Sequence, residues 1–179
     1  NVVMAVYKNA DLLRASIVSE SNSHRLGANE APPAIISVFL GTRLTAMFNE
    51  IEEKVSSRKM TPDEKTELKL NIGKIPEILL DNTDRNRTSP FAFTGNRFEF
   101  RAVGSGQSVS GPLVAMNTIL ADSLDWIANK LDSDLATGTE LNAAIQTVLK
   151  EVMDEHGAVV FGGNGYSEEW HKMAEERGL

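Results

Sequence analysis

A concentration of arginines occupies residues 84–101 of this chain, which reads DRNRTSPFAFTGNRFEFR. The segment contains four of them: Arg85, Arg87, Arg97 and Arg101. Guanidinium groups stay charged and bind carboxylates or phosphates through two parallel hydrogen bonds. In a chain of formal net charge -7, this local positive charge predicts an anionic partner. Salt bridges along a solvated strand would explain the same residues, and composition by itself favours that second interpretation.

Glu99 lies between two of these arginines at the spacing of a β-strand. Strand alternation puts Arg97, Glu99 and Arg101 on one face and the apolar Phe98 and Phe100 on the other. The Glu99 carboxylate is either neutralised by its two neighbours or binds a divalent cation, since magnesium and manganese prefer carboxylate oxygens. One glutamate does not make a metal site, so the residues alone leave both interpretations open.

Two further loops have weaker chemical signals. Residues 24–32 read HRLGANEAP, a charged loop that ends at a pair of prolines and that an ordinary surface turn would also explain. Residues 104–111 form a Gly/Ser-rich loop that could bind phosphate at the start of the next helix. That loop lacks the Gly-Lys-Ser of a P-loop, so its phosphate signal is weak.

Composition limits the possible classes of protein. The chain has 179 residues, 41% of them hydrophobic, which suffices for one domain or part of one. Its negative net charge argues against nucleic-acid binding, and no apolar run is long enough to cross a membrane. There is no cysteine, which excludes disulfides and zinc–thiolate sites and fits a cytoplasmic location. The chain begins with Asn1, not with an initiator Met, and lacks a signal peptide, so we expect it either to start inside a longer protein or to have been processed.

Helices are expected to make up most of the structure. Apolar periodicity predicts helices over residues 2–18 and 42–57, a helix that opens at Ser110 with an apolar stripe from Leu113 to Leu131, and a short strand or helix start over 34–40. Between residues 81 and 107 the sequence predicts loops around a single strand. Thr139 is the expected cap of a further helix, which should end at His156 with Gly157 in a left-handed conformation. Ser167 is expected to cap a last helix that runs through Arg177.

Two segments together resemble a known family. Residues 25–32, RLGANEAP, resemble the Arg-Leu…Glu-Ala-Pro loop of glutamine synthetases. Residues 86–89, NRTS, followed by RFEFR at 97–101, resemble the Asn-Arg-Ser segment and the Arg-hydrophobic-Glu-hydrophobic-Arg strand of the same family, in the same order. The longer phrases around them look like the type III branch, and the resemblance covers nearly the whole chain.

The resemblance implies a role for each matching residue. Arg25 and Arg101 look like the arginines that bind the substrate glutamate, and Glu30 like the flap carboxylate that closes the site and helps ammonium lose its proton. Arg87 looks like the arginine that contacts the transferred phosphate, which makes Glu30 and Arg87 the catalytic candidates. Arg97 looks like an arginine near the nucleotide, so Arg87 and Arg97 are the ATP and phosphate candidates. Glu99 looks like a metal ligand.

The sequence departs from the common forms of the family in three places. Asn29 replaces a tyrosine in a loop that is one residue shorter. Ala92 stands where the common forms have another arginine, so that Arg85 or another group must complete the phosphate site. An additional stretch at about residues 41–80 separates the two motifs, as expected of the type III branch, and we expect this helical insertion to serve subunit contacts.

The implied fold is α+β: strands of a curved sheet flanked by helices, forming the C-terminal part of a catalytic domain over residues 1–179. The implied activity is ATP-dependent ligation of ammonia to glutamate through a γ-glutamyl phosphate, with Mg²⁺ or Mn²⁺, in a ring-like homo-oligomer. We expect this piece by itself to be inactive. The alternatives are a ligase that joins glutamate to another amine, a catalytically silent structural relative, and an anion-binding module without chemistry.

Overall fold

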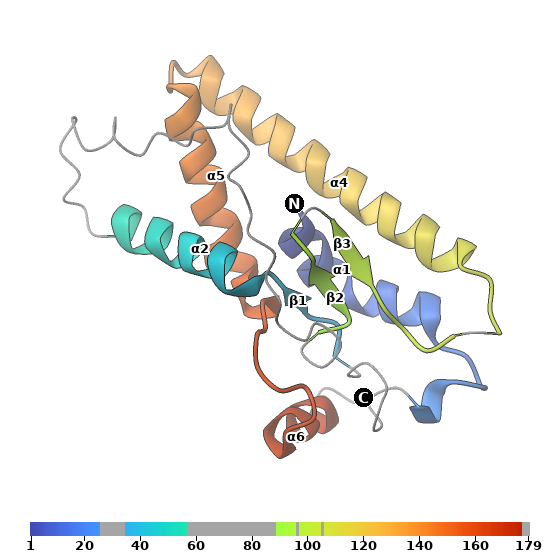
Figure 1. The fold of residues 1–179 in the computed structure, drawn as a ribbon. Coiled ribbons are helices and arrows are strands. Elements are labelled where there is room, and N and C mark those ends of the chain that lie inside the picture. Colours follow the sequence, from blue (N-terminus) through green and yellow to red (C-terminus); the bar gives the residue numbers. More distant parts are fainter. Residues whose placement is uncertain (26–34, 57–88, 96, 105, 177–179) are drawn as a thin grey trace.

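The computed structural model describes residues 1–25, 35–56, 89–95, 97–104 and 106–176. Its helices are α1 (Val2–Ile17), α2 (Gly41–Ser56), α4 (Ser110–Ala136), α5 (Leu141–His156) and α6 (Glu168–Glu176), with 3-10 turns at Ser23–Arg25 and Gly157–Val159. The strands are β1 (Val38–Phe39), β2 (Phe91–Phe93) and β3 (Phe98–Phe100). This mixture of helices with one small sheet agrees with the expected α+β class (Figure 1).

The sheet has the order β1-β2-β3, with β1 parallel to β2 and β2 antiparallel to β3. The prediction of a single strand between residues 81 and 107 is therefore wrong, because β2 is a second one. Its three residues are too few to show alternation in the sequence. In the structure Phe91 and Phe93 share a face with Phe98 and Phe100, and the rings of Phe93 and Phe98 lie 5.1 Å apart. Aromatic packing on this face stabilises the short strands.

Strand direction brings three segments to one edge of the sheet. Parallel strands begin at the same edge, so the chain enters β1 and β2 side by side. An antiparallel neighbour ends there, and accordingly the Arg101 amide donates to the Pro90 carbonyl at 2.7 Å. The hydroxyls of Ser37 and Ser89, both buried, lie 2.7 Å apart just before β1 and β2. The chains that lead in from Glu30 and Arg87 therefore reach the sheet next to Arg101.

Helix α1 is the centre of the packing. It contacts α4, α5 and β1 (Figure 1). The apolar stripe predicted from periodicity is present, but Val3, Met4 and Ala5 are buried as well. A helix that is buried all round its first turns lies inside the core. The position of α1 is thus fixed by neighbours on several sides, which matters for the turn that follows Ile17.

Helix α5 covers nearly the residues that were predicted, but the residues that cap its two ends differ from the prediction. Helix α5 is capped by Glu140, whose side chain accepts hydrogen bonds from two backbone amides, and not by Thr139. Gly157 has φ -60°, so the expected left-handed cap is wrong. The 3-10 turn that begins at this residue continues the chain with right-handed geometry. In α4 the buried residues are Ile119 and Ser123.

Helix α6 packs its apolar face beside the start of β1. Trp170 and Ala174 form a cluster with Ile35, and the Trp170 ring stacks on Phe161 with centroids 4.0 Å apart. The Phe161 amide donates to the carbonyl of Val38 in β1 at 2.9 Å. As predicted, Ser167 caps this helix, accepting from the Trp170 amide at 3.3 Å. Within the described ranges, none of the helices combines the length and apolar character that a bilayer crossing requires.

The Ser37–Ser89 contact predicts a loss of stability on mutation. Ser89→Ala removes the partner of the buried Ser37 hydroxyl and of the Ser37 carbonyl, to which the Ser89 hydroxyl also donates. Because these buried polar groups would lose their hydrogen-bond partner, the free energy of unfolding should fall by about 1–3 kcal/mol, measured by urea denaturation. Ser110→Ala is the matched control, because the Ser108–Ser110 hydroxyl pair has the same 2.7 Å separation but is exposed. Equal losses in both variants would contradict the importance of burial at this contact.

Candidate functional site

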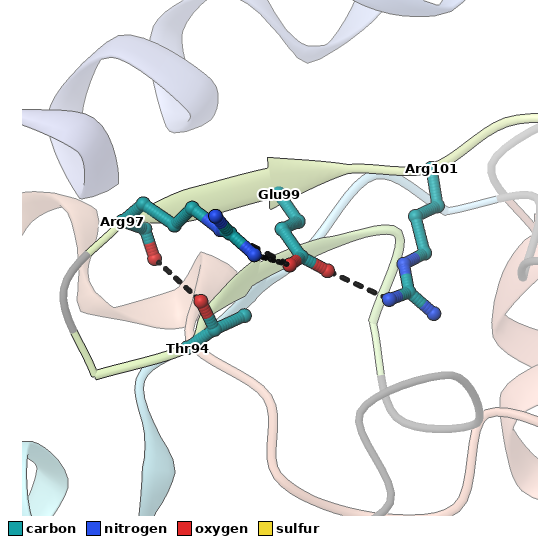
Figure 2. A network of polar contacts seen from close by, with 4 residues as sticks. All are labelled: Thr94, Arg97, Glu99 and Arg101. Carbon is teal, nitrogen blue, oxygen red and sulfur yellow. Dashed lines mark hydrogen bonds and ion pairs between the residues drawn. The ribbon is translucent and has the colours of Figure 1, made fainter. Parts of the chain in front are cut away.

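The exposed face of β3 has a carboxylate held between two guanidinium groups. The Arg101 Nη2 atom lies 2.7 Å from Glu99 Oε2, and both Nε and Nη2 of Arg97 lie 3.3 Å from Glu99 Oε1 (Figure 2). Each carboxylate oxygen thus has its own arginine. The Glu99 side chain is 23% exposed, against 46% for Arg101 and 69% for Arg97. The alternation predicted from the sequence therefore gives one polar face with the three side chains in direct contact.

These contacts determine the charge of Glu99. The hydrogen bond from Arg101 is the largest cause that lowers the pKa of this carboxyl below its ordinary value. Partial burial opposes it, while the charge of Arg101 and the contacts with Arg97 lower the pKa further. Glu99 is therefore an anion at neutral pH. Since its pKa is lowered on folding, its stabilising contribution is present above the ordinary carboxyl pKa and is lost as the pH falls through the lowered one.

Position 92, where the resemblance implied an arginine in the common forms, lies beside Glu99 in the sheet. Ala92 in β2 is the residue directly opposite Glu99 in β3, so the two side chains share a face. An arginine at position 92 would stand beside the Glu99 carboxylate, whereas the alanine methyl is buried there. Among the described residues, the side-chain hydrogen bonds and ion pairs of Glu99 are with Arg97 and Arg101. Whether Arg85 compensates for Ala92 lies outside the described residues.

Arg25 is placed by the turn that follows α1. The Arg25 amide donates to the Asn22 carbonyl at 2.9 Å in the 3-10 turn Ser23–Arg25. The Asn22 side chain is buried and donates to two carbonyls, those of Ile17 and Val103, both at 2.7 Å. Val103 follows Arg101 by two residues. A neutral amide therefore ties the turn of Arg25 to the chain that leaves the arginine-bearing strand.

A second side-chain contact joins the same two segments. The Gln107 side-chain amide donates to the Ser19 hydroxyl, and Ser19 also donates its backbone amide to Asn22 Oδ1 at 2.7 Å. Sequence reasoning missed both Asn22 and Gln107. The only signal was an asparagine and serines directly after the end of a helix, where such residues often bond backbone groups.

The described residues provide only part of what a divalent cation requires. Magnesium and manganese take several oxygen ligands, and Glu99 offers one anionic carboxylate on an accessible face. In the part of the chain that the structure describes, no three His, Asp or Glu side chains come together as a metal site would need. Glu99 therefore fits as one ligand of a cation whose other ligands come from elsewhere. To bind it, a Glu99 oxygen must remain available alongside its arginine contacts.

The predicted site residues fall into two groups. Glu99 in β3 lies together with Arg97 and Arg101, which directly flank that strand, and the turn of Arg25 is hydrogen bonded to the segment that follows them. Glu30 and Arg87 lie outside the described residues, although the chain that leads from each reaches the sheet edge at Ser37 and Ser89. The roles proposed for these six residues remain predictions.

Comparison with known proteins gives a consistent set of matches. A family model described as the glutamine synthetase C-terminal domain matches residues 144–179. A glutamine synthetase of Bacteroides fragilis (strain YCH46) is 56% identical over the whole chain, and a type-3 glutamine synthetase of Dictyostelium discoideum is 45% identical over 99% of it. A glutamine synthetase of Butyrivibrio fibrisolvens is 39% identical over the whole chain. This chain spans about a quarter of the length of these curated relatives.

The arginine contacts predict how Glu99 should titrate. In a protein labelled with ¹³C at glutamate side chains, the Glu99 carboxyl should titrate below the ordinary range of glutamate, because both arginines favour the anion. Arg101→Ala should raise that midpoint more than Arg97→Ala, since Arg101 makes the shorter and less exposed contact. An NMR titration in which the Arg97 variant has the larger effect would contradict this geometry.

Proposed function

Because this chain belongs to the glutamine synthetase family, we propose that it supplies part of the active site of a glutamate–ammonia ligase, as one section of a longer protein. The observation that carries the proposal is the Arg97–Glu99–Arg101 face of β3. It combines an ionised carboxylate with two guanidinium groups on a surface that substrates can reach. The tie between Arg101's strand and the turn of Arg25 adds a third cation to the same region.

The proposed reaction has two steps. The terminal phosphoryl group of ATP is transferred to the side-chain carboxylate of glutamate, which gives γ-glutamyl phosphate and ADP. Ammonia, formed when ammonium loses a proton, then attacks the acyl carbon, and the C–O bond to phosphate breaks to release phosphate and glutamine. A carboxylate is a poor electrophile, and conversion to the acyl phosphate provides a good leaving group. Both steps bring several negative charges together, which fixed cations stabilise in the transition state.

The arginines meet this requirement in different ways. Arg25 and Arg101 are proposed to bind the carboxylates of the substrate glutamate. Among the described residues the Arg25 guanidinium has no ion-pair partner, so it is available to a substrate carboxylate. Arg101 donates to Glu99 through Nη2, and its other N–H groups remain for a second carboxylate. Arg97, at the other end of β3 and more exposed, is proposed to lie near the nucleotide.

Glu99 is proposed to contribute one ligand to Mg²⁺ or Mn²⁺. A bound divalent cation would neutralise charge on the phosphate oxygens during transfer. Within this chain, Arg97 and Arg101 keep Glu99 ionised and fix its direction, which is what a hard cation needs from a carboxylate ligand. One carboxylate is insufficient, so the other ligands should come from the remainder of the longer protein. For the same reason we propose that this section is inactive by itself.

The remaining parts of the proposal rest on the family resemblance. Glu30 is proposed to assist deprotonation of ammonium, and Arg87 to contact the transferred phosphate. Residues 1–179 are proposed to be the C-terminal part of the catalytic domain, with a helical insertion at about 41–80 that makes contacts in a ring-like homo-oligomer. Helix α2 begins this insertion, and residues 57–80 lie outside the described ones. We also propose a cytoplasmic location, which the absence of cysteine fits.

The glutamate assignment is tested in the full-length protein. Arg25→Ala and Arg101→Ala should each weaken use of glutamate more than binding of ATP, because each leaves a substrate carboxylate partly unpaired. The loss in kcat/KM for glutamate should correspond to about 2–5 kcal/mol. Arg97→Ala is the matched control from the same strand face and should affect ATP more than glutamate. Steady-state kinetics with unchanged glutamate parameters in the first two variants would refute the assignment.

The metal assignment is tested by activity as a function of manganese concentration. Glu99→Gln keeps the shape of the side chain and can still accept hydrogen bonds from the arginines, but it offers a neutral oxygen to a cation. If Glu99 is a ligand, activity should fall steeply and be partly restored by more manganese. If Glu99 only balances Arg97 and Arg101, the loss should be modest and independent of metal. A manganese curve that overlays the wild type would therefore show that Glu99 is a salt-bridge partner.

A further inference from the structure

We propose that Asn22 is a positioning residue that sets the distance and direction between Arg25 and Arg101. The inference rests on the proposed function of these two arginines. It comes from a buried side chain that has no part in the family resemblance described above. Asn22 itself would not touch the substrate, because its side chain is only 4% exposed and its hydrogen-bonding groups are turned to the protein backbone.

The hydrogen bonds of Asn22 connect three segments: the end of α1, the turn that follows it, and the chain after β3. Its Nδ2 group donates to the carbonyl of Ile17, the last residue of α1, and to the carbonyl of Val103. Its Oδ1 atom accepts from the Ser19 amide at 2.7 Å. All three bonds are at the short end of the normal range for N–H···O contacts. The end of the central helix, the turn after it and the chain after β3 are thus held by one side chain.

The chemistry of the amide explains why asparagine is required at this point. Two carbonyls and one amide face the side chain, so it must donate twice and accept once while remaining short. Aspartate has the same shape but cannot donate when ionised, and would place one carboxylate oxygen, in the position of Nδ2, against both carbonyls. Alanine would leave the carbonyls of Ile17 and Val103 without this partner. Either change leaves backbone groups unsatisfied in a buried place, where the cost is high.

The path from Asn22 to each arginine is short. On one side, the Asn22 carbonyl accepts from the amide of Arg25. On the other, Val103 is two residues beyond Arg101, whose amide is fixed to Pro90. The second contact, from Gln107 to Ser19, joins the same two segments. If the two arginines bind one glutamate, a shift of either segment changes the separation of the two guanidinium groups and so the fit to the carboxylates.

The test uses the full-length enzyme with Asn22→Asp, and with Gln107→Ala as a milder variant should the first fail to fold. Asn22→Asp should raise the KM for glutamate about tenfold or more while leaving the KM for ATP within about twofold. Gln107→Ala should change the same constant in the same direction by a smaller factor. Asn117→Ala is the matched control, since Asn117 Nδ2 also donates to a backbone carbonyl, that of Leu113 at 2.8 Å, but on the exposed side of α4.

Two further measurements separate positioning from general destabilisation. In an Arg25→Ala background, Asn22→Asp should add little to the loss in glutamate use, because its effect passes through Arg25. Amide hydrogen exchange should become faster at Ser19 and Arg25 in Asn22→Asp. Equal increases in both Michaelis constants, or full additivity with Arg25→Ala, would overturn the inference. The inference would also be overturned if the Arg25 amide exchanged faster in the Asn22→Asp and Gln107→Ala enzymes while their KM for glutamate stayed unchanged.

The result for Arg25→Ala alone identifies which proposal has failed. If Arg25→Ala leaves glutamate use unchanged, the proposed function of Arg25 is wrong, and the inference about Asn22 falls with it. If Arg25→Ala impairs glutamate use while Asn22→Asp and Gln107→Ala do not, the proposed function stands and the positioning role of Asn22 is wrong.

Discussion

The parallel pairing of β1 with β2 is the constraint on which the arrangement of this chain depends. Parallel strands start at the same edge, so Ser37 and Ser89, which are far apart in the sequence, lie together there. The antiparallel β3 then ends where the other two begin, which brings Arg101 to that edge. Three strands of two or three residues could not maintain this register unaided. They maintain it because Val38 and Phe91 belong to the core cluster around α1, and because the Ser37–Ser89 contact joins the strand entrances.

The contribution of the Glu99 ion pairs to stability is too small to account for their arrangement. Ion pairs as exposed as those of Arg97 and Arg101 contribute little to the free energy of folding, because water and salt screen them. Their effect on Glu99 is local: they keep the carboxylate ionised and limit its directions. Phe98 and Phe100 hold the strand from the opposite face, next to the core. Glu99 is thus held by a strand that packs against the core on one face, while its carboxylate is accessible on the other. This arrangement suits the ligand recognition proposed above better than a role in stability.

Much of this structure was predictable from local sequence, and the failures have identifiable physical causes. Long helices show their period, so both ends of α1 and α5 were predicted to within two residues, and the start of α4 was predicted at Ser110. Helix burial was less predictable. Helix α4 has the apolar periodicity of a buried face, yet Leu113 and Leu124 are 46% and 54% exposed. The buried residue that joins the core cluster around α1 is Ile119. Strand β2 was missed because it is defined by its partners and not by its three residues. The alternation of RFEFR predicted the face of Glu99, whereas the placement of Arg25 depends on a tertiary hydrogen bond that no local pattern shows.

The polar contacts around the candidate site divide into two kinds that suit different tasks. Asn22 and the Ser37–Ser89 pair are neutral, buried and bonded to backbone or to each other, so they hold segments in place without adding charge. Arg97, Glu99 and Arg101 are charged and accessible, so they can exchange partners when a ligand arrives. A carboxylate at position 22 would instead set a buried negative charge against the carbonyls of Ile17 and Val103. Neutral contacts therefore allow the scaffold to be rigid while the net positive charge of the arginines remains available for binding.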